Sequence, residues 1–257
     1  MYFQKGFFMI NSNTFSNFNS KYPIYADLHT HSISSGHGSE DTITDMIRCA
    51  SESGLSLFGI SDHGPATSSS AKPSYFQSLK LADRDRFGIR VLYGAELNII
   101  NTAGDVDLDD EILSALDYAI ISIHPPIFKP YHDKDLSSTY IRAMDHPKVR
   151  FLGHIDDARF PVDFEYLLEI AKEKHVYPEI NNGSLMPDAY RINGQENCRR
   201  ILSICKKLDL PVLLSSDSHG KKNIGNMQYI FPLLEELDFP AHLVLNSDLS
   251  VLSEIIQ

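Results

Sequence analysis

Histidines end the first apolar run of this sequence, and residues of this type suit metal binding. The stretch YADLHTHS places His29 and His31 two positions apart in a segment that is typical of a β-strand. Side chains at i and i+2 of a strand point to the same face, so both imidazoles look into one space. Burying two imidazoles side by side is costly unless something pairs with them.

The other apolar runs end in similar residues. They contribute, in chain order, His63, Glu96, His124, His154, then Glu179, Asn181 and Asn182, and finally Asp217 and His219, while His37 follows in the loop after the first run. A lone histidine at a strand end is more often structural, but seven of the 11 histidines lie at such positions. Imidazole suits Zn, Fe or Mn, and carboxylates can bridge two cations. These donors are too many for one tetrahedral ion, which takes only about four. The pattern therefore predicts a centre with about two or three metal ions.

Seven apolar runs alternate with segments of helical periodicity. The runs are 24–31, 57–62, 90–97, 118–124, 150–155, 176–180 and 212–216, and the clearest helical segments are 41–54, 140–146, 163–175, 193–210 and 227–237. Alternation of this kind predicts a parallel sheet covered by helices. An open doubly wound sheet is the alternative, but no glycine-rich nucleotide loop follows the first strand. We therefore expect a (β/α) barrel with its active site at the carboxyl ends of the strands.

Length and composition are consistent with one enzyme domain. The chain has 257 residues and a net charge of −11, which disfavours a stable nucleic-acid complex. We expect a flexible extension at 1–22 and a single barrel domain at 23–257. Three cysteines without metal-type spacing, and the absence of a long apolar run, predict a soluble cytoplasmic protein with reduced thiols.

Several of these motifs together resemble the PHP (polymerase and histidinol phosphatase) superfamily. The segments DLHTHS, FGISDHGP, GAELNI, HPP, GHID, EINN, NCRR and SSDSHG are most similar to the YcdX-type phosphatases, and the similarity runs from about residue 25 to the C-terminus. The resemblance implies a distorted (β/α)7 TIM-like barrel and a trinuclear site, usually of zinc, with iron or manganese also seen.

The resemblance also implies a division of the ligands among three ions. His29, His31, Glu96 and Asp217 would hold the first, Glu96 would bridge to a second on His124 and His154, and a third would lie on His37, His63 and His219. Histidinol phosphatases of this superfamily usually carry a cysteine shortly before the third histidine of the first motif, and the segment SISSGH lacks it. This departure favours a role outside histidine biosynthesis.

We expect a phosphoric monoester hydrolase that acts on a small phosphorylated metabolite or nucleotide. A metal-bound hydroxide, available at neutral pH, would attack phosphorus in line while the ions stabilise the developing charge. Glu96, Asp217 and His219 are the expected catalytic residues within the ligand set. Arg159 is the first candidate for phosphate contact, followed by Arg191 and Lys129.

Lesser candidates surround this site. Asp62 is expected to orient a ligand histidine, the loop at 66–74 to line the mouth, and His132 to lie at the rim.

Four alternatives remain open at this stage. The first two are histidinol-phosphate phosphatase and a phosphodiesterase or nuclease that acts on short oligonucleotides. An amidohydrolase-type barrel also begins with H-x-H, but it would need a lysine where His124 ends a central strand. A non-catalytic PHP scaffold would tend to lose ligands, and this set is complete. No motif in the sequence indicates the substrate, the native metal or the oligomeric state.

Overall fold

The chain folds into a nearly closed barrel of parallel strands. The computed structural model describes residues 21–129 and 134–256. The main sheet has the strand order β1-β3-β5-β6-β7-β8-β9, with β4 antiparallel to β5 and a separate pair of β2 with β10. The strands are β1 (Ala26–Asp27), β2 (Thr30–His31), β3 (Leu57–Ile60), β4 (Asp85–Arg86), β5 (Ile89–Asn98), β6 (Tyr118–Ser122), β7 (Val149–Leu152), β8 (Tyr177–Asn181), β9 (Leu213–Ser215) and β10 (Ser218–His219). The predicted (β/α)7 barrel is confirmed.

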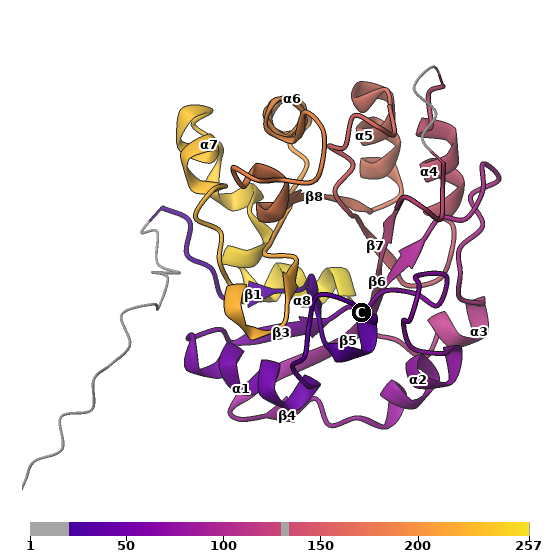
Figure 1. Cartoon of the computed structure of the whole chain (residues 1–257). Coiled ribbons are helices and arrows are strands. Elements are labelled where there is room, and N and C mark those ends of the chain that lie inside the picture. The colour runs from indigo at the N-terminus through magenta and orange to yellow at the C-terminus, as the bar shows by residue number, and fades with distance from the viewer. Residues whose placement is uncertain (1–20, 130–133, 257) are drawn as a thin grey trace, which may run out of the picture.

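Helices surround the barrel on the outside (Figure 1). They are α1 (Ile43–Glu52), α2 (Pro73–Ser78), α3 (Asp110–Leu113), α4 (Ser137–Ala143), α5 (Phe164–Glu173), α6 (Gly194–Leu208), α7 (Phe231–Glu236) and α8 (Leu249–Ile256), with 3-10 turns η1 (Ile33–Ser35), η2 (Leu79–Leu81), η3 (Asn182–Leu185), η4 (Lys221–Asn223), η5 (Ala241–Leu243) and η6 (Leu245–Ser247). Sequence determines their starts locally. Thr42 and Asp45 form a capping box at α1, and the Asp163 side chain caps α5. No helix of the described residues is long and apolar enough to cross a membrane.

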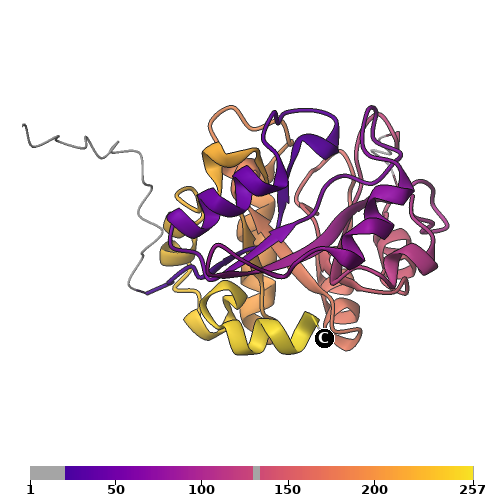
Figure 2. The ribbon, with the colours of Figure 1, turned by 90° about the horizontal axis from the view of Figure 1, so that it is seen from below.

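Apolar side chains fill the barrel interior below the carboxyl ends of the strands. Tyr118 is fully buried there, and its hydroxyl donates to the carbonyl of Leu28. Gly59 makes this possible, since a β-carbon at that position would lie 2.2 Å from the Tyr118 oxygen. Leu252 and Ile256 of α8 belong to the same cluster. Figure 2 shows α8 (yellow) at the end of the barrel opposite the loop that follows β2 (indigo). The interior is therefore packed from below and open for a site above.

A side-chain bridge closes the barrel between β9 and β1. Buried Asn246 accepts the N–H of Leu214 at 2.7 Å and donates to the carbonyls of Leu214 and Ala26, each at 2.8 Å. The main-chain carbonyl of Asn246 accepts a hydrogen bond from the N–H of Tyr25 at 3.0 Å. Asn246 thus supplies the hydrogen bonds that a direct β9–β1 ladder would make. Farther along, Ser218 and His219 pair in parallel with Thr30 and His31, which brings the last predicted ligands beside the first.

Replacing Asn246 should open this seam. In Asn246→Ala the buried groups of Leu214 and Ala26 lose their partners, so the free energy of unfolding should fall by about 2–4 kcal/mol. Denaturant titration followed by circular dichroism measures this change. Gln77→Ala, at an exposed position of α2, should cost less than about 0.5 kcal/mol. Equal, small losses in both variants would show that the bridge does not hold the barrel closed.

Candidate metal centre

The nine predicted ligands converge at the carboxyl end of the barrel, around Glu96. One oxygen of this carboxylate, Oε1, lies 2.8 Å from Nε2 of His154 and 3.2 Å from Nε2 of His124. These two imidazole nitrogens lie 3.2 Å from each other. Residues from β5 and from the ends of β6 and β7 therefore point at one location, which can be shared by one cation.

The second oxygen of Glu96 faces a different group of imidazoles. Oε2 lies 2.7 Å from Nδ1 of His63, 3.3 Å from Nε2 of His29 and 3.5 Å from Nε2 of His31. Asp217 completes this side, with Oδ1 3.2 Å from Nε2 of His31 and 3.7 Å from Nε2 of His29. Glu96 is thus placed to bridge two positions, as a carboxylate does between two metal ions.

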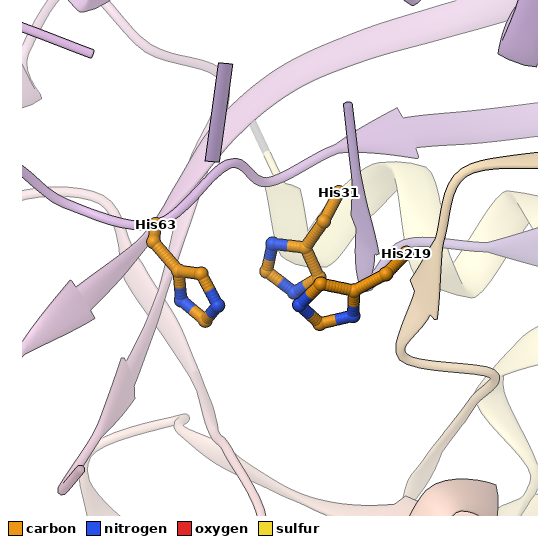
Figure 3. Close-up of side chains that lie close together, drawn as sticks. All are labelled: His31, His63 and His219. Atoms are coloured by element: carbon orange, nitrogen blue, oxygen red, sulfur yellow. The ribbon is translucent and has the colours of Figure 1, made fainter. Parts of the chain in front are cut away.

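His63, His219 and His37 form the outer part of the cluster. The ring centroid of His37 lies 4.9 Å from that of His63 and 5.0 Å from that of His219. Ligand atoms of His31, His63 and His219 all lie within 4.8 Å of one another. Figure 3 shows these three rings gathered from separate segments of the chain. This group contains His31, whereas the resemblance implies His37 in that place; the His37 ring lies beside the group.

Unpaired polar atoms show that this cluster fits cations. Among the described residues, the buried side-chain atoms without a hydrogen-bond partner include His29 Nε2, His31 Nε2, His63 Nδ1, His219 Nε2 and Glu96 Oε2. Such atoms are rare in folded proteins because each costs about 1–3 kcal/mol. These belong to the same three groups that could each hold an ion: His31/His63/His219, His29/His31/Glu96 and His63/Glu96/His124. A nitrogen-rich and carboxylate-containing donor set of this kind fits zinc, iron or manganese.

Mutual charge shifts the pKa values within the cluster. Burial alone would raise the pKa of Glu96, but His124, His29 and His63 hold it well below its usual range. Burial opposes protonation of His29, yet Glu179 and Glu96 raise its pKa well above normal. Burial and the neighbouring His63 lower the pKa of His31 instead. The anionic Glu96 and the neutral His31 are forms that bind metal, whereas the cationic form favoured at His29 would release its proton when a metal ion binds.

Two of the predicted ligands sit in strained backbone. His154 has φ of 30° and Asp217 has φ of 51°, the left-handed region that is costly for residues with a β-carbon. Such strain costs about 1–3 kcal/mol per residue and persists where other contacts hold it. The N–H of His154 donates to Glu179 at 2.7 Å, which fixes one of these turns.

Glu179 is the most important residue that sequence reasoning left outside the ligand set. Its carboxylate lies 2.5 Å from Nδ1 of His29, accepts the His154 N–H, and accepts from Ser215 Oγ and from Asn181 at 3.2 Å. A bond at Nδ1 directs Nε2 of His29 toward Glu96. The signal was a charged residue inside the buried run YPEIN, where an unpartnered carboxylate would be costly.

Asn98 and Ser35 orient two further histidines. Asn98 Oδ1 lies 2.8 Å from Nδ1 of His124, and Ser35 Oγ lies 3.0 Å from Nδ1 of His31. The i, i+2 spacing from Glu96 to Asn98 on β5 was the available signal. Asp62, predicted to orient a histidine, accepts from Ser35 at 2.7 Å and so reaches His31 indirectly.

A cavity of about 640 Å³ opens above the cluster. Its lining includes Arg159 and Arg191 and the segment 66–69, so that part of the expected mouth loop is at the mouth. Arg191 donates to Asp217 Oδ2 at 2.7 Å, and Arg159 Nε lies 2.9 Å from both oxygens of Asp157.

Lys129 is exposed and is not among the described lining residues. The predicted rim residue His132 lies outside the described residues, as does most of the predicted N-terminal extension.

Comparison with known proteins identifies the family. The model of the PHP domain matches residues 27–183, which contain seven of the nine predicted ligands. This chain belongs to the PHP domain family. A protein of Clostridium acetobutylicum that is named a probable phosphatase is 37% identical over 222 residues, covering 86% of this chain and 90% of that one. The predicted family and the predicted enzyme class, a phosphatase, are confirmed at this level.

Two solved structures have the same fold. A Listeria monocytogenes protein assigned as a histidinol phosphatase superimposes with a TM-score of 0.61 at 18% identity, over 80% of this chain and 99% of that one. The histidinol phosphate phosphatase of Lactococcus lactis, solved with zinc, L-histidinol and phosphate, gives a TM-score of 0.58 at 20% identity, over 84% and 94%. At these identities the comparison establishes the barrel.

Loss of the Glu179 charge should weaken metal binding without removing a ligand. Glu179→Gln keeps the shape but gives His29 a weaker acceptor, so zinc affinity should fall about 10–100-fold. Competition with a chromophoric chelator measures the affinity. Glu165→Gln, on the exposed face of α5, is the matched control and should bind zinc as the wild type does. A folded Glu179→Gln protein with unchanged zinc affinity would refute the orienting role.

Proposed function

We propose that this PHP-domain protein is a metal-dependent phosphomonoesterase that hydrolyses a small phosphorylated metabolite or nucleotide. The observation that carries the proposal is the set of buried, unpartnered imidazole nitrogens around Glu96, beneath a cavity that Arg159 and Arg191 line. Cationic guanidinium groups beside a cation-binding cluster suit a dianionic phosphate ester or inorganic phosphate. The net charge of −11 does not oppose this, because bound divalent ions would supply positive charge at the site itself.

About three divalent ions would be held by this chain, with zinc the first expectation and manganese or iron the alternatives. His29, His31, Glu96 and Asp217 would hold one ion, Glu96, His124 and His154 a second, and His37, His63 and His219 a third, with His31 close enough to share it. When bound, such ions stabilise charge on phosphoryl oxygens and lower the pKa of water, which supplies a nucleophile at neutral pH.

The chain's own residues position the substrate and the ligands. Glu96, Asp217 and His219 are the proposed catalytic members of the cluster, and Arg159 is the proposed contact to the phosphate. Arg191 lies beside Asp217 and keeps that carboxylate oriented, because one guanidinium nitrogen bonds to it and another bonds Ser184 at 3.2 Å. Glu179 and Asn98 fix the ring orientations of His29 and His124.

Histidinol phosphate is the second candidate substrate, because the Listeria and Lactococcus structural neighbours are named as histidinol phosphatases. The described lining offers carboxylates only at Asp157 and Asp217, and each is paired with an arginine. A leaving group that carries an ammonium ion therefore lacks an evident partner in the part of the cavity that is described. This favours another phosphomonoester.

Removal of a predicted ligand should abolish turnover. His124→Ala removes the imidazole nitrogen that lies beside Glu96 Oε1 and that we propose as a metal ligand. Hydrolysis of a chromogenic phosphomonoester by zinc- or manganese-loaded protein should therefore fall at least about 100-fold. His146→Ala, on the surface beside Asp110, is the control and should keep wild-type activity. Circular dichroism verifies that both variants fold. Unchanged turnover in folded His124→Ala would overturn the assignment.

Arg159 should act on phosphate binding more than on the metals. Arg159→Met removes a charge-assisted donor at the cavity wall, so kcat/KM should fall about 10–100-fold through a higher KM. Metal content, measured by elemental analysis, should stay at the wild-type level. The control is Arg200→Met, whose exposed guanidinium pairs with Glu165 outside the cavity. Loss of metal together with activity would instead assign Arg159 a structural role.

A further inference from the structure

We propose that Tyr190, backed by Arg159, is a specificity-determining surface that selects phosphomonoesters whose leaving group carries a flat, unsaturated ring. This inference rests on the proposed phosphomonoesterase function and names the class of its substrate. It follows from the part of the cavity that the metal cluster and the phosphate leave over.

The cavity is much larger than a phosphate group requires. A volume of about 640 Å³ falls within the range of pockets that enclose drug-sized ligands. The cluster forms one part of its lining, through residues such as His37, His124 and His219. The remainder therefore accommodates a leaving group of considerable size.

Tyr190 is an ordered aromatic wall of that remaining space. The guanidinium of Arg159 lies 4.2 Å from the Tyr190 ring centroid, a stacking distance. Asp157 holds this guanidinium through contacts to Nε and a terminal nitrogen. Tyr190 is nevertheless 73% exposed, so the Arg159 contact leaves much of the side chain available to a ligand.

Backbone hydrogen bonds join the two loops that carry this stack. The N–H of Ala158 donates to the carbonyl of Ile192 at 2.9 Å, and the N–H of Ile192 contacts Asp157 Oδ1 at 3.4 Å. The segment after β7 and the segment before α6 are thus one unit. A large exposed aromatic residue that is fixed in this way, at the mouth of a cavity, marks a contact surface better than a lone surface tyrosine does.

Other lining residues favour a ring that is uncharged. Ile123, Pro126 and Ile127 give the cavity an apolar side, and Thr67, Ser68 and Ser69 add hydroxyl-bearing residues from the loop after β3. In the described lining, both arginines are paired with carboxylates, so neither sign of charge on the leaving group is strongly favoured. A planar group can stack on Tyr190 while its edge reaches the hydroxyls.

Benzyl phosphate and cyclohexylmethyl phosphate test this inference directly. Both leave as primary alcohols of similar acidity, so they differ mainly in the flatness of the ring. Steady-state kinetics of the metal-loaded enzyme should give a kcat/KM for benzyl phosphate about fivefold above that for cyclohexylmethyl phosphate, which is the size of an aromatic stacking contribution.

Variants of Tyr190 then locate the preference. Tyr190→Ala should abolish it by lowering only the benzyl value, Tyr190→Phe should retain it, and Tyr166→Ala, an exposed tyrosine on α5, should match the wild type. Turnover of both esters without a preference, or a preference that survives Tyr190→Ala, overturns the inference while the phosphomonoesterase function stands. If the enzyme hydrolyses neither of these esters nor a chromogenic phosphomonoester, both the inference and the proposed phosphomonoesterase function are overturned.

Discussion

The carboxylate of Glu96 surrounded by imidazole nitrogens is the interaction on which the rest of this structure depends. Five histidines approach its two oxygens within 2.7–3.5 Å. Without a partner, nitrogens and carboxylates buried at this density would oppose folding, because each loses water without gaining a full hydrogen bond. Divalent cations would give these atoms partners, and on our proposal the binding of metal would also stabilise the fold.

The barrel fold brings the members of this cluster together. Parallel strands end at one rim, and residues at their carboxyl ends meet there although they are distant in sequence. The seam between β9 and β1 must also close, since it brings His31 beside His219. Asn246 supplies that closure from η6, and the β2–β10 pair continues it toward the cluster. Glu179 holds the strained backbone at His154, and Arg191 bonds the side chain of Asp217, the other strained residue.

Sequence patterns predicted much of this arrangement for a physical reason. A buried strand must be apolar, so runs such as Tyr118–Ser122 are visible without a structure, and polar residues at their ends stand out. Convergence of those ends follows from the parallel topology alone. The convergence of these side chains could therefore be predicted from the sequence, and we propose that they are the ligands of a metal centre.

Residues that act through contacts between distant segments were not readable in the same way. Asn246, 220 positions from Ala26, belongs to no local pattern. The stacking of Arg159 on Tyr190 depends on how two loops pack. Glu179 carried a signal, a charge in an apolar strand, but its role as the partner of His29 required the barrel's geometry. The short α8, which covers the lower end of the barrel, likewise became apparent only from its packing.

Metal content of protein purified without chelator tests the central claim most directly. Elemental analysis should find about two to three equivalents of zinc, iron or manganese per chain, because the donor set exceeds what one ion uses. Less than about one equivalent, not restored when these metals are added to the folded protein, would contradict the account. The cluster would then be a network of paired side chains, and the phosphatase mechanism proposed for it would fail.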